Sequence, residues 1–291
     1  SADAAYQKAI EKVSFDYDTI SSSYNKSVAG EPETISGSTL TTVIAHLWDL
    51  VPGKKYYFRI KVVTPTGTVY GTEKTFNTSD TIRSEILYND ELDYGAVTDI
   101  EGNTYKTIQI GTQTWMAQNL ETTKLNDGTD IPVVLVKSDW TALSSPGYCY
   151  YNYDSISYGV LYNWYTVSTS RLCPEGWHVP ADEEWSALTD YLGGEVDAGS
   201  LIKETGLSHW NSPNTGATNE SGFTALPGGY RSNSGVFNNI RRFGYWWSST
   251  EAPSSNDAYY RKVSYSYTNT DRSSSNKKSG FSVRCIKNNG D

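Results

Sequence analysis

Alternating polar and apolar positions between residues 36 and 78 predict antiparallel β-strands. The run TLTTVIAHLWDL ends where Pro52 and Gly53 break it, and YYFRIKVVTP then alternates again. Gly67 suits a hairpin turn, after which a last strand is expected around residues 73–76. This pattern predicts an all-β unit in the N-terminal part of the chain.

The C-terminal part mixes strand and helix patterns. TYKTIQIGTQTWMAQNL predicts two strands joined at Gly111, and the Asn-Asp-Gly of KLNDGTDIP predicts another tight turn. Helical spacing of apolar residues predicts one helix near residues 158–167 and a clearer one in DEEWSALTDYLGG, which has acids in its first turn. The mixture predicts an α+β unit with a long loop region over residues 200–245.

The patterns stop between these two parts, where SDTIRSEILYNDELDYGA is acidic and has no clear period. We therefore expect a multidomain chain. Residues 1–79 would form the first domain, residues 80–96 a linker, and residues 97–291 the second domain.

The second domain contains six motifs in order: VTDIEGNTYKTIQIGTQTWMAQNL, YGVLYNWYTV, CPEGWHVPADEEWSAL, GFTALPGGYR, WWSSTE and GFSVRCIKN. Together they resemble the Fibrobacter succinogenes major paralogous domain, a family found mainly in exported proteins of Bacteroidetes-like bacteria. The resemblance covers roughly residues 95–289. It implies an α+β, C-type lectin-like fold, which sulfatase-modifying enzymes share, and the GWHVPADEEW segment also resembles those enzymes.

The first domain resembles fibronectin type III modules of bacterial surface proteins. The resemblance lies in the order L-x-x-L-x-P-G-x-x-Y-Y-F-R, then G-x-x-Y-G and T-F-x-T. It implies an all-β sandwich in which Tyr56 is the candidate corner tyrosine. Such modules act mostly as spacers.

Charge and hydropathy exclude some partners. With 33 acidic and 24 basic residues, the net charge is -9, which disfavours nucleic acid as a partner. The longest apolar run, IPVVLV, is far shorter than the roughly 18 residues of a transmembrane helix. The chain shows no signal-peptide pattern at Ser1, which leaves open a precursor with a leader or a lipid anchor. Localisation therefore rests on the resemblance, which implies the cell surface, with an outer-membrane lipoprotein as one form.

The three cysteines and three histidines give no support to an enzyme. The lectin-like resemblance implies a disulfide between Cys173 and Cys285, which leaves Cys149 as an expected buried, inert thiol. Sulfatase-modifying oxidases bind copper through two closely spaced cysteines near the C-terminus, and this chain has only Cys285 there. The histidines lack metal-ligand spacing, and the acids Asp182 to Glu184 are explained by a first helical turn.

The loops of residues 200–245 are the expected place for a ligand, because amides and hydroxyls can match sugar hydroxyls and aromatic rings can stack on sugars. Turn formation is the competing explanation for the same residues. A structural calcium is a further expectation, with Asn219 and Glu220, or Asp154 and Asn152, as oxygen donors. The candidate ligand-binding residues are Trp210, Asn214, Asn219, Glu220, Tyr230 and Arg231.

The sequence thus predicts a non-enzymatic, exported cell-surface protein with an adhesive role, in which a spacer presents a domain that binds a glycan or another surface protein. A structural or assembly component of a surface structure is the alternative. A degenerate enzyme of the sulfatase-modifying type is a remote third interpretation.

Overall fold

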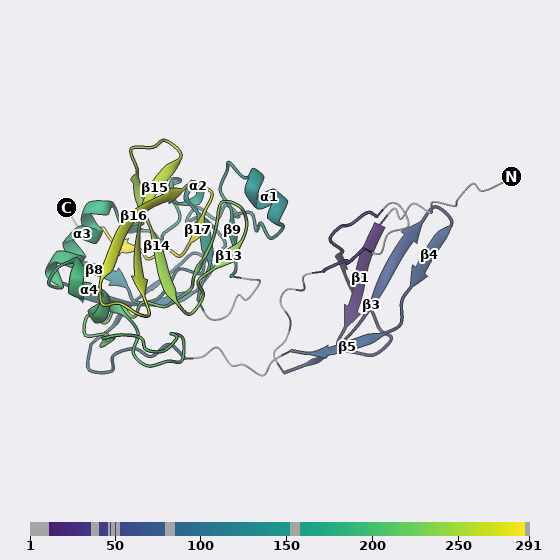
Figure 1. Cartoon of the computed structure of the whole chain (residues 1–291), viewed down its shortest axis with the longest axis horizontal. Helices are drawn as coiled ribbons and strands as arrows, with labels where there is room; N and C mark the ends of the chain where they lie inside the picture. The colour runs from purple at the N-terminus through teal and green to yellow at the C-terminus, as the bar shows by residue number, and fades with distance from the viewer. Residues whose placement is uncertain are drawn as a thin grey trace. The chain divides into compact units, whose positions relative to one another are not determined.

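The computed structural model describes residues 12–35, 41–45, 47, 50, 53–78, 85–151 and 158–288. The chain divides into two compact units, Ser1–Ile82 and Arg83–Asp291. Each unit is described by itself (Figure 1).

The N-terminal unit is built on one antiparallel sheet. Its strands are β1 Lys12–Asp18, β2 Lys26–Ala29, β3 Lys55–Thr64, β4 Gly67–Tyr70 and β5 Lys74–Asn77. The order is β2-β1-β3-β4, and β5 also pairs with β3. Tyr56 is buried on β3 and stacks on Phe76, with ring centroids 5.5 Å apart.

The strand pattern from residue 55 to residue 77 follows the sequence prediction, whereas β1 and β2 were not predicted. The sequence KVSFDYD of β1 does alternate polar and apolar residues, so this strand could have been predicted from its local pattern. Much of the predicted strand TLTTVIAHLWDL lies outside the described residues. The described residues of the N-terminal unit are β-rich, as expected. They contain no second sheet that would complete a fibronectin-type sandwich.

The described residues of the C-terminal unit form three antiparallel sheets. Their strand orders are β13-β12-β17-β10-β9, then β11-β18-β8-β7-β6, and β14-β15-β16. The strands are β6 Gly95–Thr98, β7 Thr104–Ile110, β8 Gln113–Met116, β9 Tyr148–Cys149, β10 Leu161–Asn163, β11 Trp177–His178, β12 Tyr230–Arg231, β13 Phe237–Asn238, β14 Phe243–Glu251, β15 Asp257–Ser264, β16 Thr270–Asn276, β17 Gly280–Phe281 and β18 Ile286–Lys287.

Helices are a minor part of this unit. They are α1 Lys137–Ala142, α2 Trp164–Val167, α3 Asp182–Tyr191 and α4 Glu195–Ile202. Figure 1 shows α3 and α4 together at one end of the unit and α1 at the other. The predicted α+β, C-type lectin-like class is therefore wrong, because the unit is nearly all-β.

The error arose mainly in residues 158–167. Their apolar residues fit a helical spacing, but residues 161–163 form strand β10 between β9 and β17, and only the single turn of α2 is helical. Nearly every residue of this segment is buried, so its apolar positions carry no face-selective period. The prediction for α3 was correct. Its missing side-chain cap at Ala181 is partly replaced by Glu184, whose carboxylate accepts the Ala181 N–H at 2.8 Å.

Aromatic residues hold the sheets and α3 together. Trp185 on α3 packs on Trp115 of β8, with ring centroids 4.7 Å apart, and both rings contact Phe223. A second cluster places Phe281 against Trp247 at 4.3 Å. Most of the aromatic content expected to pack a β-rich core does so.

Residues 85–94 pack on the C-terminal unit, although they belong to the predicted linker. The Leu87 N–H donates to Glu204, the Tyr88 hydroxyl to Gln118, and the Asn89 amide to the carbonyl of Asn219. We call residues 85–94 the strap. Because its hydrogen bonds reach three separate parts of the second unit, the strap is structurally part of that unit.

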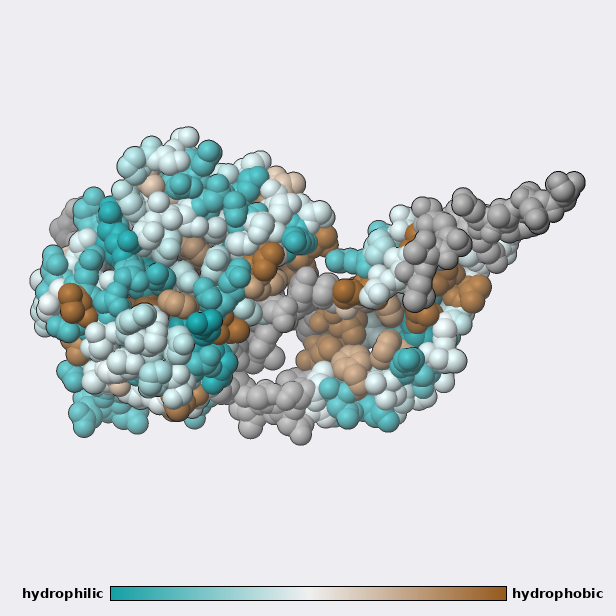
Figure 2. Space-filling model, in the orientation of Figure 1, coloured by the Kyte–Doolittle hydropathy of each residue, from teal (hydrophilic) through white to brown (hydrophobic). Residues whose placement is uncertain are grey.

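The surface of the C-terminal unit that is visible in Figure 2 is mainly polar, with scattered apolar residues. Among the helices in the described parts of the chain, none combines the length and hydropathy needed to cross a membrane.

Candidate functional site

Four of the six predicted ligand-binding side chains are buried and already hydrogen-bonded. Trp210 donates to the Ala225 carbonyl at 3.1 Å, and the Asn214 amide donates to two carbonyls of residues 204–206. Asn219 bonds both the backbone and the hydroxyl of Thr224. These contacts stabilise the loops themselves, so turn formation, the competing explanation, accounts for these positions.

Arg231 is also internal. Its guanidinium donates to the carbonyls of Val134 and Leu135 at 2.6 and 2.8 Å. Of the remaining two candidates, Glu220 is exposed and Tyr230 is half-buried. Every aromatic ring of residues 200–245 is buried or half-buried, so none of them is fully exposed.

Of the four predicted calcium ligands, Asn219 and Glu220 fall within the described residues. Both polar ends of the Asn219 side chain are used by Thr224, while Glu220 points from an exposed position. Asn152 and Asp154 lie outside the described residues. Within the described ranges, no group of three or more His, Cys, Asp or Glu side chains is placed to hold a metal ion.

A polar hollow elsewhere on the C-terminal unit offers a better site. It has a volume of about 350 Å³. Its walls are Glu101, Asn103, Glu121, Thr123, Tyr150 and Val160. We call it the carboxylate cavity. Among the described residues, its lining contains two carboxylates, an amide, a threonine hydroxyl and a tyrosine ring with its hydroxyl, and no Lys or Arg.

The first wall is the turn between β6 and β7. The Asp99 carboxylate accepts the N–H groups of Glu101 and Asn103 at 2.9 and 3.0 Å, which fixes the turn. Gly102 occupies the left-handed region at φ 87°, a conformation that favours glycine. The turn thereby presents the side chains of Glu101 and Asn103 to the cavity.

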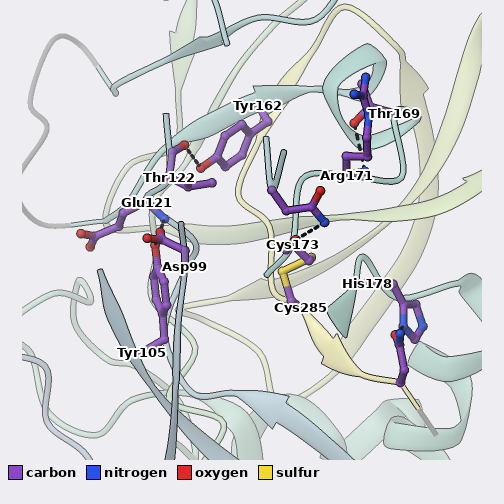
Figure 3. Close-up of a disulfide and its surroundings, with 12 residues drawn as sticks. Asp99, Tyr105, Glu121, Thr122, Tyr162, Thr169, Arg171, Cys173, His178 and Cys285 are labelled. Atoms are coloured by element: carbon purple, nitrogen blue, oxygen red, sulfur yellow. Dashed lines mark hydrogen bonds between the residues drawn. A yellow bond between two sulfur atoms is a disulfide. The ribbon is translucent and has the colours of Figure 1, made fainter. Parts of the chain in front are cut away.

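The second wall is the segment after β8, which two buried tyrosines hold in place (Figure 3). The Tyr105 hydroxyl donates to Asp99 at 2.7 Å and accepts the Glu121 N–H at 3.1 Å. The Tyr162 hydroxyl donates to the Thr122 carbonyl at 2.6 Å. Burial, with the hydrogen bond to Asp99, raises the pKa of Tyr105, so the hydroxyl stays protonated as this bond requires.

The two walls are joined by Glu101. Its carboxylate accepts the Thr123 hydroxyl at 2.7 Å and the Thr122 hydroxyl at 3.0 Å. In Figure 3 the Glu121 side chain is turned outward, away from Asp99 and Tyr105. Both carboxylates line the cavity, and Glu101 also connects its two walls.

The third wall carries the aromatic ring. Tyr150 follows β9 and packs edge-on against buried Tyr148, with ring centroids 5.6 Å apart. Burial and the neighbouring Tyr150 raise the pKa of Tyr148, so its hydroxyl stays neutral. Tyr150 is only partly buried and can offer its ring to the cavity.

The disulfide lies close to this site in Figure 3 and connects Cys173 with Cys285. The bond confirms the pairing that the resemblance implied. Cys149 is free and buried, and burial raises the pKa of its thiol to about 12, which disfavours the reactive thiolate.

The N-terminal unit has an apolar groove of about 330 Å³ between its sheet and residues 43–47. Phe15, Phe58 and Phe76 form its floor. Neighbouring residues of the same segment lie outside the described ranges, so we assign the groove no ligand.

The sequence analysis missed the carboxylate cavity because its walls come from four separate places in the chain. A turn signal at Gly102, between Glu101 and Asn103, was the one local sign of an exposed polar wall. The sequence could not show that Glu121 and Tyr150 reach the same hollow.

The comparisons with known proteins agree with the motifs of the second unit. No curated protein matches the chain significantly. The Fibrobacter succinogenes major domain matches residues 108–287, which is well over half of the chain and spans β8 to β18. The chain therefore belongs to the Fibrobacter succinogenes major domain family.

Proposed function

We propose that this protein is a non-enzymatic binding protein that recognises a hydroxyl-rich ligand, such as a glycan, in the carboxylate cavity. The observation that carries the proposal is the lining, in which Glu121, Asn103 and Thr123 surround a hollow that Tyr150 also lines. Carboxylates and amides accept hydrogen bonds from sugar hydroxyls, and a tyrosine ring can stack on the apolar face of a sugar. A phosphate-rich ligand is disfavoured, because no cation lines the hollow.

Export to an oxidising compartment is part of the same proposal. The Cys173–Cys285 disulfide supports it, because such bonds persist outside the reducing cytosol. Display at the bacterial surface fits a chain in which a smaller β-rich unit precedes the binding unit.

The test is a glycan array followed by titration calorimetry of any hit. We expect Glu121→Gln and Tyr150→Ala each to weaken binding about tenfold or more, since one lost charge-assisted hydrogen bond or stacking contact is worth roughly 1.4 kcal/mol. Glu220→Gln, which changes an exposed carboxylate of the loops, is the matched control and should bind as the wild type does. Unchanged affinity in both cavity variants would show that the ligand binds elsewhere.

A role in surface assembly is the second candidate. The observation that favours it is the burial of the aromatic rings of residues 200–245, whose loops are therefore mostly structural. An array without hits, together with concentration-dependent self-association in sedimentation, would favour assembly over glycan recognition.

A further inference from the structure

Three buried cations of the C-terminal unit are paired with backbone carbonyls. Lys203, Arg231 and Arg284 are 0%, 1% and 0% exposed. In the described part of the chain none of the three forms an ion pair with a carboxylate. A buried charge needs compensation, and here loop carbonyls supply it.

Lys203 has the simplest arrangement. It follows α4, and its ammonium donates to the carbonyls of Thr215 and Tyr267 at 2.8 Å each and of Ser264 at 3.0 Å. An ammonium has three N–H donors, so all three are used. Burial lowers the pKa of Lys203 to about 8, and the group therefore still carries its third proton at pH 7.

The three carbonyls come from segments that have little regular structure to hold them. Thr215 lies in the loop after α4, whereas Ser264 ends β15 and Tyr267 lies in the turn before β16. Lys203 also lies over the ring of Trp210, at 5.8 Å from its centroid. One side chain thus connects the end of a helix, a loop and a hairpin turn.

This is the task that a bound metal ion performs in many loop-rich proteins, where backbone carbonyls from several segments converge on one cation. We propose that the Lys203 ammonium is the structural cation of residues 200–220 and 264–269, in place of a calcium ion. The loops then need no metal ion, and the Asn219 side chain forms hydrogen bonds with Thr224 instead of binding a metal.

The test compares Lys203→Met with a matched control. Methionine keeps most of the side-chain volume and removes the charge and the three donors. We expect the melting temperature of the C-terminal unit to fall by about 10 °C, because three buried carbonyls lose their partner. Lys262→Met removes a partly exposed lysine from β15, where it pairs with Asp271 at 3.0 Å, and should change the melting temperature by about 2 °C or less.

Hydrogen exchange locates the effect. In Lys203→Met, the amides of Thr215 and Ser200, which bond to the carbonyls of Tyr265 and Thr268, should exchange at least tenfold faster. The amides of β7 serve as an internal reference and should be unchanged. A Lys203→Met protein with the melting temperature and exchange of the wild type would overturn the proposal.

A second measurement needs no variant and remains informative if Lys203→Met does not fold. The wild-type chain is melted in the presence of a calcium chelator and again with added calcium. We expect the same melting temperature in both conditions. If the chelator also speeds the exchange of the Thr215 and Ser200 amides and calcium reverses this, a metal ion holds these loops and the proposal is overturned.

Discussion

At the scale of single residues, buried polar side chains of the C-terminal unit donate hydrogen bonds to backbone carbonyls that lie outside helices and long strands. Arg284 illustrates this, because its guanidinium donates to the carbonyls of Met116 and Thr224 and to the Asn119 side chain. Two of these bonds satisfy buried backbone carbonyls, and the third satisfies the Asn119 side chain. Side-chain hydrogen bonds of this kind stabilise the loops of the unit.

His178 is a residue-scale case in which pH matters. Its two ring nitrogens lie 2.7 Å from the Asn288 oxygen and 2.9 Å from the Glu184 carboxylate. The hydrogen bond to Glu184 raises the pKa of His178 above its ordinary value. Burial acts to raise the pKa of Glu184, but the hydrogen bonds from His178 and from the Ala181 N–H together lower it.

We predict that this pair stabilises the protein most between about pH 4.5 and pH 6.5, the ordinary values of the two groups. A raised histidine pKa gives stability that is complete below pH 6.5 and is lost as the pH rises through the folded value. A lowered glutamate pKa gives stability that is lost as the pH falls through its folded value.

The measurement is urea unfolding of the wild type and of His178→Gln across pH 4 to 9. The side chains of His178 and Glu184 are 39% and 24% exposed, so solvent screening limits the maximum difference in unfolding free energy to about 1 kcal/mol. A difference that stays constant across this pH range would contradict the assignment.

At the scale of elements, short strands depend on connections from outside their own sheet. The Met116 N–H donates to the carbonyl of Cys285 at 3.0 Å, and the Asn126 side chain donates to the carbonyl of Cys173 at 3.0 Å. The disulfide therefore joins the end of β8 and the start of β18 to the loop that follows α2. The second wall of the carboxylate cavity lies between these attachments.

Removing the disulfide should lower the unfolding free energy by about 4 kcal/mol, because the two cysteines are 112 residues apart and the bond restricts a long loop in the unfolded chain. The comparison is chemical unfolding of the wild type and of the double variant Cys173→Ala, Cys285→Ala. Cys149→Ala is the control, since it removes a buried thiol that closes no loop. Equal losses in both proteins would mean that packing, and not the cross-link, carries the effect.

At the scale of the whole molecule, the two units differ in the number of sheets and helices that form them. The described N-terminal residues form one sheet, whereas the described C-terminal residues form three sheets, four short helices and the strap. The family match begins at residue 108, after the strap and after β6, so these parts lie outside the matched region. The second unit of the structure therefore begins at an earlier residue than the region that matches the family.

We predict that a chain of residues 84–291 is more stable than a chain of residues 97–291. The shorter chain lacks the bond from Leu87 to buried Glu204 and the ring of Tyr88, which stacks edge-on with Tyr94 at 5.4 Å. Loss of a buried hydrogen bond and of two packed rings should cost about 3 kcal/mol or more. Calorimetric melting of both chains checks this, and equal melting temperatures would show that the strap contributes nothing.

The sequence by itself determined the features that depend on neighbouring residues. It predicted the hairpin at Gly111, helix α3, and the tight turn at residues 126–128, where the Gly128 N–H bonds to the Leu125 carbonyl. Turn and helix signals are local, so they can be recognised without tertiary contacts. The lectin-like resemblance added the disulfide between Cys173 and Cys285, which the structure confirms.

Only the tertiary structure decided the rest, because it depends on groups far apart in the chain. Residues 161–163 became a strand when partners from β9 and β17 paired with them. Arg231 was predicted to bind a ligand, but its guanidinium donates to backbone carbonyls almost a hundred positions earlier in the chain. The carboxylate cavity likewise forms because Glu101, Glu121 and Tyr150 lie close together in the fold. No local sequence pattern predicts that these residues meet.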